Sequence, residues 1–160
     1  MSSKHPHETE IAVDPDVPLV RITREFDAPP EQVYRAHTDP DLLVQWLGPR
    51  NVEMKIDYFD CRTGGSYRYI HVSDGEEYGF NGCFHELRPA ELIVQTFAFE
   101  GFPDGVALER LVLEDLGNGR TRLVATSLVD SFEGRDAFVA SGMDVGVREG
   151  YERLDELLAS

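Results

Sequence analysis

The chain has 160 residues, 41% of them hydrophobic and 10% aromatic, which is enough apolar material for one domain with a sizeable core. Its formal net charge of −15 argues against binding to nucleic acids or anionic membranes, because both attract surfaces rich in Lys and Arg. No apolar run approaches the length of a membrane span, and the first residues lack the apolar core of a signal peptide. We therefore expect a soluble, acidic, cytoplasmic protein.

Residues 1–17 are polar and contain prolines, so we interpret them as a flexible N-terminal tail with a tightening near Ile11. A single domain is expected to span residues 18–160. It begins with strand formers at Leu19–Phe26. Two short helices follow. The first starts at Asp27-Ala-Pro-Pro and has Val33, Tyr34 and His37 on its inner face, and the second covers residues 41–46 after Asp39-Pro40.

From residue 51 onwards, apolar and polar residues alternate with the period of two that is typical of strands. Turn signals of Gly, Pro, Asn and Asp separate the expected strands, which cover residues 52–58, 66–72, 78–87, 92–100, 107–116 and 121–129. Because the connections between consecutive strands are short, the pattern predicts antiparallel pairing.

The last stretch, residues 130–160, carries a long amphipathic helix. Its apolar stripe consists of Met143, Val147, Tyr151, Leu154 and Leu158. Three glycines spaced four residues apart, Gly142, Gly146 and Gly150, form a second, bare stripe. A glycine inside a helix costs about 1 kcal/mol relative to alanine. Two explanations fit this stripe: close backbone packing on a sheet, which we favour, or the shaping of a cavity.

The order of these elements predicts an α+β fold. A curved antiparallel sheet of about seven strands would wrap around the long C-terminal helix, with two short helices after the first strand. A curved sheet that grips a helix leaves a pocket between them. The spacing of Cys61 and Cys83 permits a disulfide, but a cytoplasmic location favours two reduced thiols.

Several segments carry a family resemblance. They are Trp46-Leu-Gly-Pro49, Gly64-Gly-Ser-Tyr-Arg-Tyr69, residues 80–89, residues 113–123 and residues 142–154. In this order, over about residues 19–158, the chain resembles the AHSA1-like (activator of Hsp90 ATPase homologue 1-like) branch of the SRPBCC superfamily, which also contains START and Bet v 1-like proteins. The resemblance implies a helix-grip fold with a deep internal cavity. It implies little about chemistry, because the superfamily includes lipid carriers, hormone binders, polyketide cyclases and co-chaperone domains.

The chain also departs from that family. Many relatives have Trp where this chain has Leu47 and Val147, and smaller side chains there would enlarge or reshape the cavity. Strand parity and the helix stripe place a set of side chains at this cavity. The expected cavity residues are Trp46, Tyr58, Tyr67, Tyr69, His71, Phe80, Phe97, Glu109, Met143, Val147 and Tyr151.

Two of these residues are candidates for acid–base chemistry. His71 and Glu109 inside an apolar cavity would shift each other's pKa and could transfer protons. We favour the alternative that both lie at strand ends in water or contact Arg110 or Arg68 on the outside of the sheet, because a carboxylate in a cavity must be paired. We therefore assign no catalytic residue. The histidines match no metal-binding spacing, and no nucleotide, dinucleotide or hydrolase signature occurs, so we expect neither a metal nor a cofactor.

The function that we expect is binding of a hydrophobic small molecule, without obligatory catalysis. The first alternative is a cyclase- or hydrolase-type enzyme that uses cavity acid–base residues. The second is an Hsp90-type co-chaperone or stress-related interaction module, which would require a large exposed patch. A homodimer is compatible with an exposed sheet edge or with the acidic helix face, although no sequence feature demands it.

Overall fold

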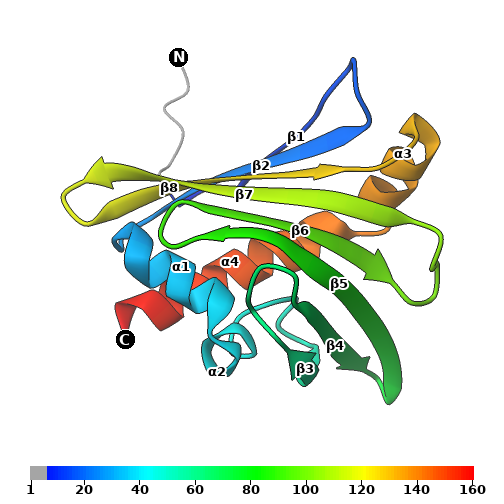
Figure 1. Ribbon diagram of the computed structural model, residues 1–160, viewed down its shortest axis with the longest axis horizontal. Coiled ribbons are helices and arrows are strands. Elements are labelled where there is room, and N and C mark those ends of the chain that lie inside the picture. Colours follow the sequence, from blue (N-terminus) through cyan, green and yellow to red (C-terminus); the bar gives the residue numbers. More distant parts are fainter. Residues whose placement is uncertain (1–6) are drawn as a thin grey trace.

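A computed structural model describes residues 7–160, which form a curved antiparallel sheet with a long C-terminal helix along one face (Figure 1). The strands are β1 (Glu10–Val13), β2 (Leu19–Phe26), β3 (Glu53–Phe59), β4 (Ser66–Ser73), β5 (Glu76–Arg88), β6 (Leu92–Phe99), β7 (Val106–Gly117) and β8 (Arg120–Leu128). The helices are α1 (Pro30–Thr38), α2 (Pro40–Leu43), α3 (Phe132–Ala140) and α4 (Met143–Ala159). The predicted α+β helix-grip architecture is confirmed.

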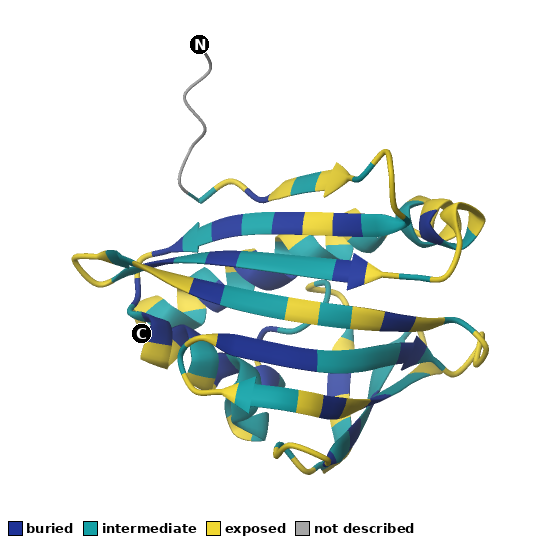
Figure 2. Cartoon of the chain, turned by 45° about the horizontal axis from the view of Figure 1, so that its top comes forward, coloured by how far each residue is buried: buried dark blue, intermediate teal, exposed yellow. Residues whose placement is uncertain are grey.

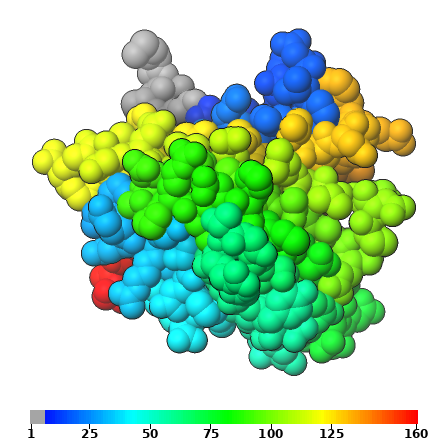
Figure 3. Space-filling view, in the orientation of Figure 1, coloured from blue at the N-terminus to red at the C-terminus, as the bar shows by residue number. Residues whose placement is uncertain are grey.

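The strand order is β1-β2-β8-β7-β6-β5-β4-β3, so the only non-consecutive neighbours are β2 and β8. This pairing brings the first long strand beside the last one. The resulting sheet curves around α4, and Figure 3 shows that the sheet and α1 hide most of this helix from one side. Burial alternates along several strands (Figure 2), as expected for strands with one face on a core. No helix in the described part of the chain is long and apolar enough to cross a membrane.

The N-terminal segment differs from the expected tail. Residues 10–13 form β1, which pairs antiparallel with β2 and brings the sheet to eight strands. The strand has four residues and is largely exposed, and it lies at the segment near Ile11 where the sequence indicated a tightening of the tail. Residues 1–6 of the expected tail lie outside the described residues.

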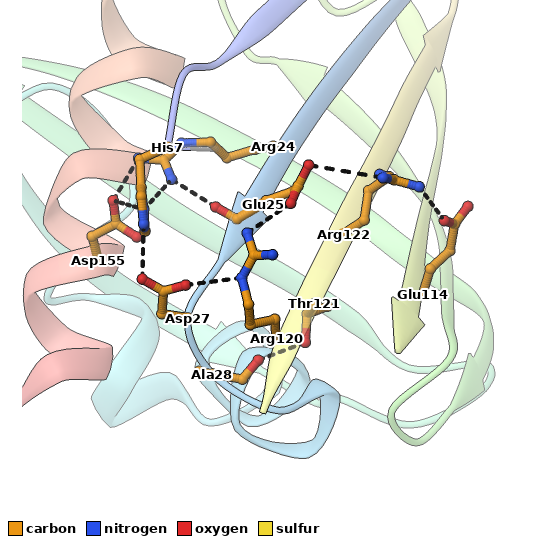
Figure 4. A network of polar contacts seen from close by, with 10 residues as sticks. All are labelled: His7, Arg24, Glu25, Asp27, Ala28, Glu114, Arg120, Thr121, Arg122 and Asp155. Carbon is orange, nitrogen blue, oxygen red and sulfur yellow. Dashed lines mark hydrogen bonds and ion pairs between the residues drawn. The ribbon is translucent and has the colours of Figure 1, made fainter. Parts of the chain in front are cut away.

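A polar network joins this segment to β2 and α4 (Figure 4). The Arg24 guanidinium is only 2% exposed and donates to Asp155 of α4 over 2.6 Å. His7 Nε2 lies 2.8 Å from Asp27 Oδ2, and Arg120 Nε lies 3.1 Å from the other oxygen of Asp27. Arg24 shares its strand face with buried apolar residues, so this pairing compensates a cation placed within the core.

The final helical stretch is divided. The expected long helix with the stripe from Met143 to Leu158 is α4, but a separate helix, α3, precedes it and ends at Ala140. Between them Gly142 has a φ of 90°, in the left-handed region that favours glycine. Ser131 caps α3 by accepting a hydrogen bond from the backbone nitrogen of Gly134 at 2.9 Å. Gly142 therefore marks a helix boundary and does not belong to the bare stripe.

The other two glycines of that stripe face the segment that follows α2. A Cβ on Gly150 would lie 3.3 Å from the backbone nitrogen of Gly48 and 3.3 Å from the carbonyl oxygen of Trp46. A Cβ on Gly146 would meet only the Pro49 ring, at 3.5 Å. Close backbone packing therefore explains Gly150, although its partner is a loop and not the sheet.

Candidate functional site

Aromatic side chains cover the inner face of β4, β5 and β6. Tyr67 and Tyr69 stack with ring centroids 6.0 Å apart and an interplanar angle of 12°. Tyr69 stacks in turn on Phe80 at 5.3 Å, and Phe80 stacks on Phe97 at 5.4 Å. The contacts continue from strand to strand because each ring lies within reach of its cross-strand or diagonal neighbour. They give the interior one continuous aromatic wall.

Burial falls off along this interior. On β7, Leu113 is 6% exposed, whereas Leu111 and Glu109 retain partial exposure although they share its face. On α4, Leu154 is 0% exposed, whereas Val147 and Met143 are only partly buried. Both gradients run toward the N-terminal half of α4. One end of the core is therefore fully buried, whereas at the other end Ala107 and Ser127 are buried but Leu111, Glu109, Val147 and Met143 keep partial exposure.

Glu109 lies at the partly exposed end, between two polar neighbours in the sheet. The register places it directly opposite Gln95 of β6 and Ser127 of β8. Gln95 Nε2 lies 3.3 Å from Glu109 Oε1 and 3.3 Å from Tyr67 Oη. Burial raises the pKa of Glu109 to about 7, against smaller opposing effects of Gln95 and Ser127. The carboxyl therefore changes its charge near neutral pH.

Three tyrosines share the environment of this carboxyl. Burial raises the pKa of Tyr67, Tyr69 and Tyr151, and the negative charge of Glu109 raises each of them further. Because an ionised phenol would be both desolvated and repelled by the carboxylate, these hydroxyls stay protonated. The site thus combines one titrating carboxyl with neutral phenols from β4 and α4.

His71 lies in a separate environment. Burial lowers its pKa to about 4, and the positive charge of Arg153 lowers it further. Its ring packs against Gly48, where an added Cβ would lie 2.8 Å from His71 Cε1. The groups that act on Glu109 are Gln95 and Ser127, so the two acid–base candidates do not form a pair. The favoured prediction placed both side chains at strand ends in water, but neither His71 nor Glu109 is fully exposed.

Two of the expected cavity residues, Tyr58 and Trp46, lie away from the partly exposed end of the interior. Tyr58 is 46% exposed, so its expected place in the interior is wrong. A register shift between Ile56 and Tyr58 interrupts the alternation of β3, and Phe59 contacts the interior ring of Phe84 at 5.6 Å instead.

Trp46 is 2% exposed and donates its Nε1–H to the carbonyl oxygen of Ala36 at 2.9 Å. It packs on Tyr151 at the closed end of the core.

The described residues do not include three or more His, Cys, Asp or Glu side chains arranged to hold a metal ion. Two surface hollows, of about 230 and 200 Å³, lie along the N-terminal segment and α4. Residues 8–11 and Arg148 line the first hollow, whereas His7, Asp27 and the last residues of α4 line the second. Neither opens into the space around Glu109.

Other proteins share this sequence pattern and this arrangement of sheet and helix. The family model of the activator of Hsp90 ATPase homolog 1-like protein matches residues 27–159. The chain belongs to this family. The matched residues include every side chain of the inner wall described above, whereas β1 and β2 precede them.

Solved structures agree with this assignment. A crystal structure of a protein from Chromobacterium violaceum is 30% identical, with a TM-score of 0.78, over 89% of this chain and 98% of that chain. A protein from Rhodobacter sphaeroides is also 30% identical, with a TM-score of 0.84, over 94% and 97% of the two chains. A solution structure from Arthrobacter aurescens is 26% identical, with a TM-score of 0.86, over 94% and 91%. No curated protein matches the chain.

Sequence reasoning missed two residues of the polar centre, Gln95 and Ser127. Both lie on the inward-facing side of their strands, because Gln95 is two residues from Ile93 and Ser127 is two residues from Ala125, and residues two apart share a face. Parity alone gives the face of a strand and not the partner across it. The register that sets both residues beside Glu109 depends on the pairing of three strands.

Proposed function

We propose that this member of the family binds a hydrophobic small molecule between the inner face of the sheet and the N-terminal half of α4. The observation that carries the proposal is the incomplete burial of inward-facing side chains at that end, beside a closed core at the other. Apolar side chains that keep accessible surface inside a fold mark a place where an apolar ligand can be buried favourably.

The shape of the wall indicates the kind of molecule. Phe80 and Phe97 stack in parallel on the sheet side, and Met143 and Val147 face the core from α4. Flat rings opposite flexible or small aliphatic side chains suit a flat or elongated apolar molecule. Binding in the cytoplasm is part of the proposal and rests on the acidic composition of the chain and its free cysteines.

A substitution on α4 tests the proposal. Val147→Trp places an indole in the space that a ligand would occupy, and Val145→Trp places the same group on the solvent side of the same helix, where Val145 is 51% exposed. The first measurement is native mass spectrometry of each purified protein, followed by calorimetric titration with β-naphthol, a neutral aromatic probe. We expect Val147→Trp to weaken probe binding at least about tenfold and Val145→Trp to leave it unchanged. A folded Val147→Trp protein with normal affinity would refute the proposal.

A second candidate function is acid–base catalysis on the bound molecule. It is favoured by the pKa of Glu109, which burial raises to about 7, because a general acid or base works best when its pKa is near the ambient pH. In that case Glu109→Gln would abolish turnover of a substrate and leave its binding largely intact.

A further inference from the structure

The polar centre around Glu109 also indicates which chemical group a ligand would carry. Glu109, Gln95 and Ser127 form a row across β6, β7 and β8 on the inner face of the sheet. Tyr67 of β4 joins the row through Gln95. In an otherwise apolar interior, these side chains supply the hydrogen bonds that can orient a ligand.

The directions of the hydrogen bonds can be assigned from Tyr67. Its hydroxyl donates to the carbonyl oxygen of Thr96 at 2.6 Å, so its only proton is engaged. In the contact between Tyr67 and Gln95, the amide of Gln95 must therefore be the donor. Gln95 therefore turns its NH2 group toward Tyr67 Oη, and the same nitrogen donates to Glu109 Oε1, each over 3.3 Å. Both amide protons are thus used. Neither Tyr67 nor Gln95 has a proton left for a ligand.

Two groups in the row keep unused capacity. The hydrogen bond from Gln95 reaches only Oε1 of Glu109, which leaves the second carboxyl oxygen as an acceptor. Ser127 is 7% exposed, and its Oγ makes no hydrogen bond of normal geometry with residues 7–160. It lies close enough to Glu109 for a weaker hydrogen-bond contact, which lowers the pKa of that carboxyl. Buried polar groups without partners are rare in folded proteins, and each one calls for an explanation.

We propose that Glu109 and Ser127 recognise a hydroxyl or amino group on the ligand. The free carboxylate oxygen of Glu109 accepts the proton of that group, and the Ser127 hydroxyl donates to its oxygen or nitrogen. The ligand class is therefore a flat apolar molecule with one hydrogen-bond donor, such as a phenol, an alicyclic alcohol or an aromatic amine. The inference rests on the proposed binding function and specifies its selectivity.

The charges around Glu109 also favour a neutral ligand with a hydrogen-bond donor over an anionic one. The groups that face Glu109 are Gln95 from β6, Ser127 from β8, Tyr67 and Tyr69 from β4, and Tyr151 from α4. All five are neutral at physiological pH, so they do not offset a second negative charge. An anionic head group would be repelled by the Glu109 carboxylate in a poorly solvated site.

Three probes that share one ring system test this selectivity. They are β-naphthol, which carries a donor, its methyl ether, which only accepts, and β-naphthoate, which is anionic. Calorimetric titration at about pH 8, where Glu109 is ionised, should give β-naphthol an affinity about tenfold higher than the ether. β-Naphthoate should bind most weakly. At about pH 5 the carboxyl is protonated, and the preference for β-naphthol over its ether should shrink.

Substitutions on one strand separate the inference from the proposed function. Glu109→Leu removes the acceptor and should bring the two affinities within about twofold of each other. Glu114→Gln, on the same strand with a side chain that is 48% exposed, should keep the wild-type preference. Equal wild-type affinities for naphthol and ether would overturn the inference and leave the binding function intact. Absence of binding by all three probes would overturn both.

Discussion

Replacement of Glu109 by Gln should make the protein more stable, and the gain should depend on pH. Burial raises the pKa of this carboxyl from 4.5 to about 7 in the folded state. Each pKa unit corresponds to about 1.4 kcal/mol, so the folded protein holds the ionised carboxylate at a cost of about 3 kcal/mol relative to the unfolded chain. The amide of Gln has a similar shape and never ionises, so the variant avoids this cost.

The direction of the pH dependence follows from proton binding. Below about pH 4.5 the carboxyl is protonated in both states and folding carries no penalty. Between about pH 4.5 and pH 7 the unfolded chain releases the proton while the folded chain keeps it, so the free energy of unfolding falls as the pH rises. Above this window both states are ionised, and the penalty is constant.

Urea denaturation of the two proteins at several pH values measures the effect. The single tryptophan, Trp46, is 2% exposed and reports unfolding by its fluorescence. The stability of the variant minus that of the wild type should rise from near zero at about pH 4 to about 3 kcal/mol at about pH 8. Glu114→Gln controls for the loss of one surface charge and should show no such rise. If the difference for Glu109→Gln stays constant across this range, the folded protein does not raise the pKa of this carboxyl.

Three other features allow direct tests. Gly150→Ala should lower the free energy of unfolding by about 1–3 kcal/mol, because the new methyl group meets loop backbone at 3.3 Å. Gly146→Ala, whose new methyl group makes only an ordinary contact with the Pro49 ring at 3.5 Å, should raise this free energy by about 1 kcal/mol through helix propensity; thermal melts compare the two. Arg24→Met should lower the stability to urea by about 3 kcal/mol, because a 2% exposed partner of an ion pair is lost. With iodoacetamide at about pH 8, the exposed Cys83 should react quickly and Cys61 slowly, because burial raises the pKa of the Cys61 thiol to about 11.

Each test has a clear contrary result. Equal melting temperatures for Gly150→Ala and Gly146→Ala would contradict the close approach of α4 to the loop. An Arg24→Met protein as stable as the wild type would mean that the ion pair gives no net stabilisation. The cysteine prediction fails if the Cys83→Ser protein still shows a fast-reacting thiol.

Most of the fold could be predicted from local patterns. Alternation along Leu19–Phe26 and the later strands gave their faces, and the stripe from Met143 to Leu158 gave the face of the final helix that packs on the core. These signals are local because a residue's burial depends first on the period of its own element. The turn signals between consecutive strands correctly indicated antiparallel pairing, since short connections leave few alternatives.

The errors occurred where the backbone departs from its regular period. Tyr58 was expected inside, but the bulge beside Ile56 moved it to the solvent side. Gly142 was counted within a helix, but its φ of 90° divides α3 from α4. A bulge or a left-handed residue is adopted to fit distant parts of the fold, so a local pattern contains little sign of it.

The sequence by itself determined which residues favour the interior and in which order the strands and helices follow. Only the tertiary structure decided which polar side chains meet there. Pairing of three strands set Glu109 between Gln95 and Ser127, and the separation of β4 from β7 by two strands kept His71 apart from Glu109. The physical reason is that register depends on contacts between segments far apart in the chain, whereas hydrophobic periodicity depends only on near neighbours.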